Sequence, residues 1–214
     1  MGFLATVVSI IQPILGVLYS LPVIGYYLDL WSLLLTASFA RFGSGHIVAN
    51  NVKQCRRPNK LLKLYEYEGC PFCRKVREAL CVLDLDAIIY PCPRETFASY
   101  GFVKDSRYRP EAKKLGGKCQ FPLLVDENEE QPVILYESDK IVKYLWTKYG
   151  DKATATPTYQ LGSTKFSFFF MMLASCLRCF PEHGLIRIPS KKPSKLLVLY
   201  GFEPSPFCKK VREI

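Results

Sequence analysis

The feature that most constrains the fold is a break between a bulky apolar stretch and a run with helical spacing. Residues 61–67 alternate in the manner of a strand, and Gly69, Cys70 and Pro71 interrupt them. Pro71 suits the first turn of a helix, where its missing N–H costs nothing. We therefore expect a strand that leads directly into a helix beginning at Cys70. The apolar positions of this helix are Phe72, Val76, Ala79, Leu80, Val82 and Leu83.

The segments that follow continue this alternation of strands and helices. Residues 87–91, 121–126 and 132–136 have the composition of strands, and the acidic turn 126–131 joins the last two into a hairpin. We expect a helix within 95–115, irregular around Pro110, and a closing helix over 138–149. The order β-α-β-α-β-β-α predicts an α/β sandwich with right-handed crossovers.

Two cysteines one helical turn apart carry the clearest chemical signal. A helix N-terminus lowers the pKa of a cysteine there, so Cys70 is a candidate nucleophile, and Arg74, Lys75 and Arg77 add positive potential. Cys73 is placed to resolve a mixed disulfide. The alternatives are a zinc half-site or two core cysteines. Zinc would need a second pair, and the other pair, Cys176 and Cys179, lies in a different region, so no metal is expected.

The remaining cysteines do not indicate a disulfide framework. The chain has nine cysteines, an odd number at irregular spacings, and its 214 residues are enough to bury a core. A reducing compartment is the better expectation.

Several motifs together resemble a known family. Cys-Pro-Phe-Cys at 70–73, the strand start Phe121-Pro122 and Tyr136-Glu-Ser-Asp resemble the glutaredoxin and glutathione-transferase N-terminal branch of the thioredoxin fold. The fold implied is a thioredoxin-like three-layer sandwich. Residues 65–78, 90–93, 116–118 and 121–126 resemble more closely the tandem thioredoxin-like proteins of plants and algae, which are usually plastid proteins. A cytoplasmic location is the alternative.

The resemblance implies roles for particular residues. Pro122 would be a cis-proline facing the cysteines, and the backbone of Phe121 would pair with a cysteinyl thiol compound; the alternative is an ordinary trans proline at a strand start. Glu137 and Ser138 would hold the γ-glutamyl end of glutathione, or serve only as helix-start residues. Cys119 is either a third thiol near the site or a bystander, and Cys92 is expected to be structural.

Three functions remain open at this point. The first is a glutaredoxin-like thiol-disulfide oxidoreductase, in which Cys70 attacks protein disulfides, Cys73 resolves, and glutathione is the co-substrate. The second is a membrane-attached, non-catalytic binding or scaffold subunit with the same fold. The third is a glutathione-dependent transferase or isomerase. A transferase would follow this domain with an all-helical one, for which residues 151–214 are short and unusual in composition.

Part of the chain is written twice. Residues 60–79 and 195–214 share 13 identities in 20 positions, with Ser205 in place of Cys70 and Cys208 in place of Cys73. The organisation we expect is an apolar leader and basic linker (1–57), a thioredoxin-like domain (58–150), a linker with an apolar stretch (151–192) and a truncated second copy (193–214). The second copy, a strand at 196–200 and a short helix, is too small for a domain. We expect residues 190–214 to be mobile or to borrow an edge of the first domain or of a partner chain.

Charge and hydropathy bear on partners. Residues 1–40 contain one charged side chain, Asp29, and basic residues follow at Arg41, Lys53, Arg56 and Arg57. This pattern indicates a helical leader that associates with a membrane, or two short buried or interfacial helices. The net charge of +10 lies outside the nearly neutral block 58–150, and no basic face interleaved with aromatics accompanies it. A nucleic-acid partner is therefore not expected.

Overall fold

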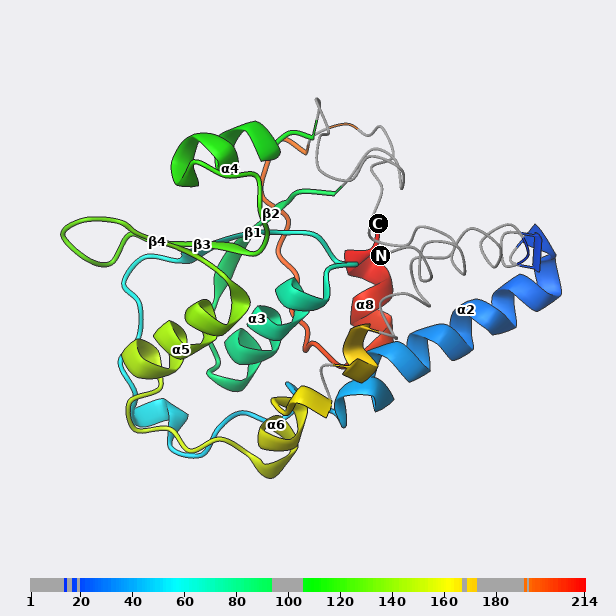
Figure 1. The fold of residues 1–214 in the computed structure, drawn as a ribbon, viewed down its shortest axis with the longest axis horizontal. Coiled ribbons are helices and arrows are strands. Elements are labelled where there is room, and N and C mark those ends of the chain that lie inside the picture. The colour runs from blue at the N-terminus through cyan, green and yellow to red at the C-terminus, as the bar shows by residue number, and fades with distance from the viewer. Residues whose placement is uncertain are drawn as a thin grey trace.

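A four-stranded mixed sheet forms the centre of the protein (Figure 1). The computed structural model describes residues 14, 17–18, 20–93, 106–166, 169–172, 191 and 193–214. The strands are β1 (Leu62–Glu66), β2 (Ala87–Pro91), β3 (Leu123–Asp126) and β4 (Val133–Tyr136), in the order β2-β1-β3-β4. β1 pairs in parallel with β2, while β3 is antiparallel to both β1 and β4.

Helices cover both faces of this sheet. Figure 1 shows α3 (Pro71–Val82) and α5 (Ser138–Tyr149) on one face and α4 (Arg109–Gly116) on the other. Side chains of β1, α3 and α5, with Leu62, Leu64 and Leu145 fully buried among them, form the larger core, and Tyr65, Leu123 and Ala112 belong to a smaller core under α4. The three layers and the order of elements are those predicted from the sequence. Of the helix predicted within 95–115, residues 95–105 lie outside the described residues. Around Pro110, where an irregular stretch was predicted, the structure instead has the first turn of a regular helix, α4, in which a proline is tolerated.

One buried carboxylate links the end of β3 to α5. Asp126 is fully buried and accepts hydrogen bonds from the hydroxyls of Tyr149 (2.6 Å) and Tyr144 (2.8 Å) and from the Lys148 ammonium (3.0 Å). Burial by itself would raise the pKa of Asp126, but the bonds from Tyr149, Asn128 and Tyr144 hold it well below its usual range. The bonds from α5 fix that helix, and with it the residues at its first turn, against the sheet.

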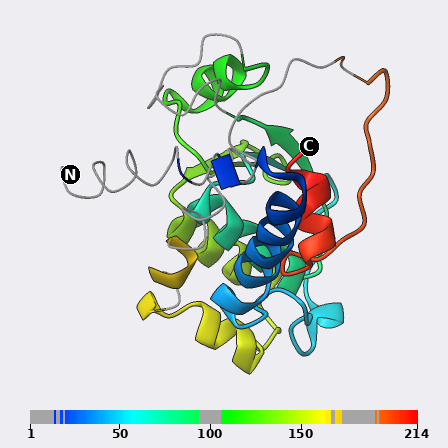
Figure 2. The same cartoon turned by 90° about the vertical axis from the view of Figure 1, so that its right-hand side faces the viewer.

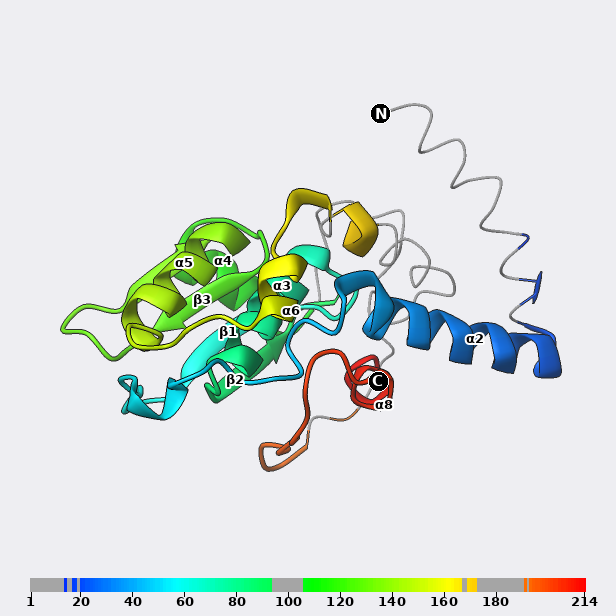
Figure 3. The same ribbon diagram turned by 90° about the horizontal axis from the view of Figure 1, so that it is seen from below.

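The N-terminal region contributes α2 (Pro22–Ala37), which projects from the sheet domain (Figure 3). Tyr26, Tyr27 and Trp31 on this helix are exposed. Within the described part of the chain, no helix combines the length and apolarity needed to cross a bilayer. Most of residues 1–20 lies outside that part, so membrane association of the leader stays a prediction.

The C-terminal repeat docks on the rest of the chain. Its helix α8 (Pro206–Arg212) lies beside α2, as Figures 1 and 2 both show. Residues 196–200 are not the strand predicted from the sequence: they have no regular secondary structure, are exposed and lie outside the sheet. A strand needs a neighbour for its backbone groups, and in the part of the chain that the structure describes no strand pairs with this segment. The short helix α6 (Pro157–Gly162) and two 3-10 helices, Phe39–Arg41 and Val52–Gln54, complete the described elements.

Candidate functional site

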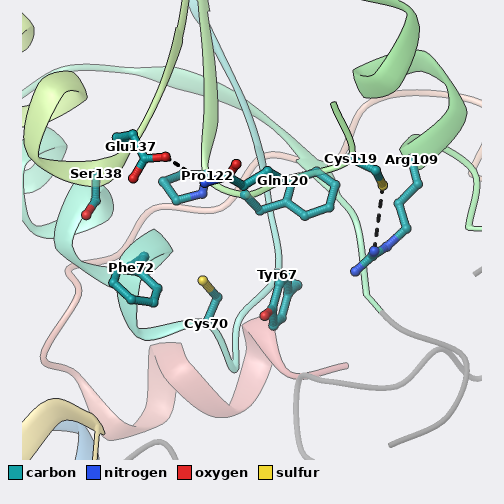
Figure 4. Close-up of a pocket in the computed structure, with 10 residues that line it drawn as sticks. Tyr67, Cys70, Phe72, Arg109, Cys119, Gln120, Pro122, Glu137 and Ser138 are labelled. Carbon is teal, nitrogen blue, oxygen red and sulfur yellow. Dashed lines mark hydrogen bonds between the residues drawn. The ribbon is translucent and has the colours of Figure 1, made fainter. Parts of the chain in front are cut away.

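A pocket of about 300 Å³ opens at the end of β1, where the sheet meets the starts of α3 and α5 (Figure 4). Four separate parts of the chain contribute to it: the β1–α3 turn, the start of α4, the loop before β3 and the start of α5. Its lining residues are Tyr67, Cys70, Phe72, Arg109, Cys119, Gln120, Phe121, Pro122, Glu137 and Ser138.

Cys70 is the N-cap of α3. Its backbone is extended (φ −84°, ψ 118°), and its sulfur accepts the backbone N–H of Cys73 at 3.3 Å. Pro71 occupies the first turn, as predicted. Figure 4 shows the sulfur pointing into the pocket toward Pro122, between Phe72 and Tyr67. The rest of the residue is enclosed, with 3% of its surface exposed.

The pKa values of the two thiols are shifted in opposite directions. Burial tends to raise the pKa of Cys70, but the Cys73 thiol and the backbone N–H groups of Cys73 and Phe72 donate to its sulfur, and the net effect is a lowered pKa. The pKa of Cys73 is raised well above its ordinary value by full burial and by the bond that its thiol donates to Cys70. Glu66, buried at the end of β1, raises both pKa values. Both thiols are free.

The basic side chains of α3 do not provide the positive potential predicted from the sequence. Arg74 bonds to Glu78 (3.1 Å), and Arg77 pairs with Glu66, with Glu68 (3.1 Å) and with Glu203 (2.9 Å). Lys75 pairs with Asp139 across the groove to α5. Because each cation faces a carboxylate, the lowered pKa of Cys70 comes from the hydrogen bonds of the helix start rather than from these charges.

Pro122 faces the cysteine site across the pocket. The Phe121–Pro122 peptide bond is cis, as the family resemblance implied. The ring of Phe121 stacks under the Arg109 guanidinium, whose carbon lies 4.8 Å from the ring centroid. Arg109 is itself held by bonds to the backbone carbonyls of Cys92 (3.1 Å) and Pro93 (3.0 Å). It therefore presents a fixed positive charge at this end of the pocket.

The opposite end of the pocket is formed by the start of α5. Glu137 has a positive φ of 67° and accepts a bond from Gln120 Nε2 at 2.7 Å. Ser138 is the first residue of the helix and is buried. The unpaired N–H groups of a helix start favour a carboxylate nearby. The pocket thus has hydrogen-bond donors and acceptors at one end, a guanidinium at the other and a thiol between them.

The structure brings most of the predicted site residues together. Cys70, Phe121, Pro122, Glu137 and Ser138 line one pocket, while Cys73 and Pro71 lie behind it in the first turn of α3. Of the two other cysteines discussed above, Cys119 lines the pocket, and Cys92 is buried in the smaller core.

Sequence reasoning missed four lining residues: Tyr67, Phe72, Arg109 and Gln120. Tyr67 and Gln120 adjoin motifs that had been recognised, so their proximity was a usable signal. Arg109 had none, because the sequence does not show that α4 folds over the loop before β3. Among the described residues no group of histidine, cysteine and carboxylate side chains has the arrangement of a metal site.

Comparison with known proteins agrees with this geometry. Residues 64–153 match the family model described as "Glutathione S-transferase, N-terminal domain". This part of the chain is therefore similar to the N-terminal domain of glutathione transferases. A comparison with curated proteins found no match.

Among solved structures, a glutathione transferase of Bombyx mori is similar, at 28% identity and a TM-score of 0.33. The match covers 44% of this chain and 38% of that transferase, so this chain spans well under half of the protein it resembles.

Proposed function

We propose that the protein is a glutathione-dependent thiol-disulfide oxidoreductase of glutaredoxin type. One observation carries the proposal. Cys70, whose pKa is lowered, faces a pocket, and Cys73, whose pKa is raised, lies one helical turn behind it. The lowered pKa of Cys70 increases the fraction of nucleophilic thiolate at a given pH, whereas the raised pKa of Cys73 keeps that thiol protonated until it attacks.

The chemistry follows from this difference. The Cys70 thiolate attacks one sulfur of a substrate disulfide, the S–S bond breaks, and the other sulfur leaves as a thiolate that takes up a proton. Cys73 then gives up its proton and attacks the mixed disulfide on Cys70. A Cys70–Cys73 disulfide forms and the second substrate thiol is released. Two molecules of glutathione reduce the enzyme and leave as oxidised glutathione, so two electrons pass from glutathione to the substrate.

The pocket suits glutathione on both sides of Cys70. The start of α5, with Glu137 and Ser138, offers groups for the γ-glutamyl end, and Phe121, whose backbone would pair with the cysteinyl part, also lines the pocket. Arg109 supplies a positive charge for the glycyl carboxylate. The similarity of residues 64–153 to the transferase N-terminal domain supports glutathione as the bound thiol.

A glutathione transferase or isomerase is the second candidate, and the family match favours it. Such an enzyme uses bound glutathione itself as the nucleophile and has no need of a resolving cysteine. A second thiol, the fully buried Cys73, lies one helical turn after Cys70; the oxidoreductase gives it the resolving role, and the transferase gives it none.

Paired assays on the full chain separate the two functions. One measures glutathione-coupled reduction of a glutathionylated peptide, and the other conjugation of glutathione to an electrophilic aryl halide. We expect the first activity in the wild type and its loss in Cys70→Ser. Conjugation that survives Cys70→Ser, with no reduction by the wild type, would establish the transferase instead.

A further inference from the structure

The two copies of the repeated segment are in contact with each other. Residue n of 66–78 corresponds to residue n + 135 of 201–213. In this correspondence Glu68 matches Glu203, and Arg77 matches Arg212. The first copy contains the β1–α3 turn and the first turns of α3, and the second contains α8.

The ion pairs between the copies are reciprocal. Arg77 of the first copy bonds to Glu203 of the second (Nε–Oε2, 2.9 Å), and Arg212 of the second bonds to Glu68 of the first (Nε–Oε2, 2.9 Å). Each arginine also pairs with the glutamate of its own copy, Arg77 with Glu68 and Arg212 with Glu203, both at 3.1 Å. Exchanging the two copies leaves this pattern of four contacts unchanged.

The next position repeats the exchange. Arg74 lies 3.8 Å from Glu203, and its counterpart Lys209 lies 3.1 Å from Glu68. Each of the two cations also pairs four residues along its own helix, Arg74 with Glu78 and Lys209 with Glu213. A contact in which residue i meets j while j meets i is the property of a twofold, isologous interface.

The charged residues at this contact are buried from solvent. Glu203 is 2% exposed, and Arg74, Arg77, Glu68 and Lys209 are each at most 6% exposed. Buried charges at this density are tolerated only when each has its partner in place. The segment that fills the site must therefore carry a glutamate and two cations at the spacing found in both copies.

We propose that this charged face of the first copy is a self-recognition surface, on which residues 66–78 of a second chain can replace residues 201–213. The first copy itself carries every charge needed at the contact. In a second chain, Glu68 would replace Glu203, Arg74 would replace Lys209, and Arg77 would replace Arg212. Two chains would then pair about a true twofold axis, with α8 displaced in each. In the single chain α8 is the intramolecular occupant of the surface.

Contacts with α2 extend the same correspondence. Ser38 Oγ donates to the carbonyl of Pro204 (2.9 Å), and Lys210 pairs with Asp29 (3.0 Å). The equivalent positions in the first copy, 69 and 75, are glycine, which keeps the backbone carbonyl, and lysine, which keeps the charge. A second chain would therefore retain both bonds to α2.

The attached α8 segment and a second chain compete for this self-recognition surface. A segment of the same chain acts at an effective concentration of roughly millimolar, so it excludes a second chain at ordinary protein concentrations. Releasing α8 should therefore convert the protein from a monomer into a dimer. This inference does not depend on the proposed redox activity.

The test is sedimentation velocity on the full chain at about 50 µM, well below the effective concentration of the attached segment. The solution contains a reductant, so that disulfide-linked dimers are excluded. Lys209→Glu/Arg212→Glu places two negative charges against Glu68 and releases α8 while leaving the first copy intact. Lys191→Glu/Lys195→Glu is the matched control, because it changes the charge equally at exposed positions that precede α8.

We expect a monomer for the wild type and the control, and a dimer for the released chain. Adding Glu68→Gln to the released chain should weaken the dimer about tenfold or more, since a loss of about 1.4 kcal/mol is enough for that.

A released chain that stays monomeric while β1 keeps its hydrogen-exchange protection overturns the proposal. The proposal is also overturned if the wild type is a dimer and the charge reversal makes it a monomer, because α8 would then be exchanged between chains. If the charge reversal unfolds the protein, Lys209→Gln/Arg212→Gln is measured in its place and judged by the same outcomes.

Discussion

Removing one carboxylate from the contact between the two copies should detach α8 without unfolding the domain. Glu203 accepts bonds from Arg77 at 2.9 and 3.1 Å and lies 3.1 Å from an Arg212 nitrogen, with 2% of its surface exposed. Glu203→Gln keeps the shape and removes the charge, which leaves buried guanidinium groups facing fewer anions. Breaking a buried ion pair by removing one partner costs about 3–5 kcal/mol.

This loss of free energy should weaken the docking of the C-terminal segment. The segment can leave the domain and return its charges to water, so the free energy of the local opening changes while that of global unfolding does not. A loss of about 3 kcal/mol corresponds to a rise of roughly 100-fold in the opening equilibrium. We expect amide exchange across 206–212 to accelerate by this factor, and exchange in β1 to stay as in the wild type.

Native-state hydrogen exchange read by mass spectrometry provides the measurement. Lys210→Gln is the control, because Lys210 is largely exposed and its pair with Asp29 is a surface pair, worth about 0–1 kcal/mol. Equal exchange across α8 in the two variants would refute the reasoning. An unprotected α8 in the wild type would refute it as well, since the segment would then not be docked.

Three further predictions follow from the site and the sheet. Alkylation of Cys70 by iodoacetamide should titrate below the ordinary cysteine pKa of about 8.5, because the helix-start bonds stabilise the thiolate; a midpoint at or above that value contradicts the assignment. Asp126 has a lowered pKa in the fold, so its stabilisation is complete above the ordinary aspartate pKa of about 4 and is lost as the pH falls through the folded value. In urea titrations Asp126→Asn should therefore be less stable than the wild type at neutral pH, with a gap that narrows toward low pH; a gap that is constant with pH contradicts this. Ser138→Ala should raise the KM for glutathione several-fold with little change in kcat, and steady-state kinetics that show the reverse would place Ser138 outside the binding site.

The sheet and its helices could be predicted from the sequence because local patterns are strong there. The strand at β1, the break at Gly69 and the helix from Pro71 each have a distinct residue signature, and the structure places them as expected. Cys70, which lies between the break and the helix, was predicted for the same reason, although Tyr67 and Phe72 beside it in the pocket were missed. The predicted roles of pocket residues in binding glutathione came from family resemblance and not from the residues alone.

Features made by contacts distant in the chain could not be predicted. Arg109 reaches the pocket only because α4 packs over the smaller core and bonds to carbonyls at the end of β2. The charges of Arg74 and Arg77 seemed available to the thiolate because their buried partners, among them Glu203, lie far along the chain or around a turn. The segment 196–200 has a strand's composition but no neighbour to pair with, and composition does not reveal that.

The central claim is that Cys70 attacks and Cys73 resolves, and intact-mass spectrometry after a single turnover tests it most directly. The reduced full chain is mixed with a glutathionylated peptide, the reaction is quenched with acid, and the intact mass of the protein is measured. The account predicts that the wild type loses two hydrogens and releases glutathione, that Cys73→Ser accumulates a mixed disulfide on Cys70, and that Cys70→Ser does not react. A mixed disulfide that accumulates on Cys73, or a Cys70→Ser variant that still turns over the peptide, would contradict it.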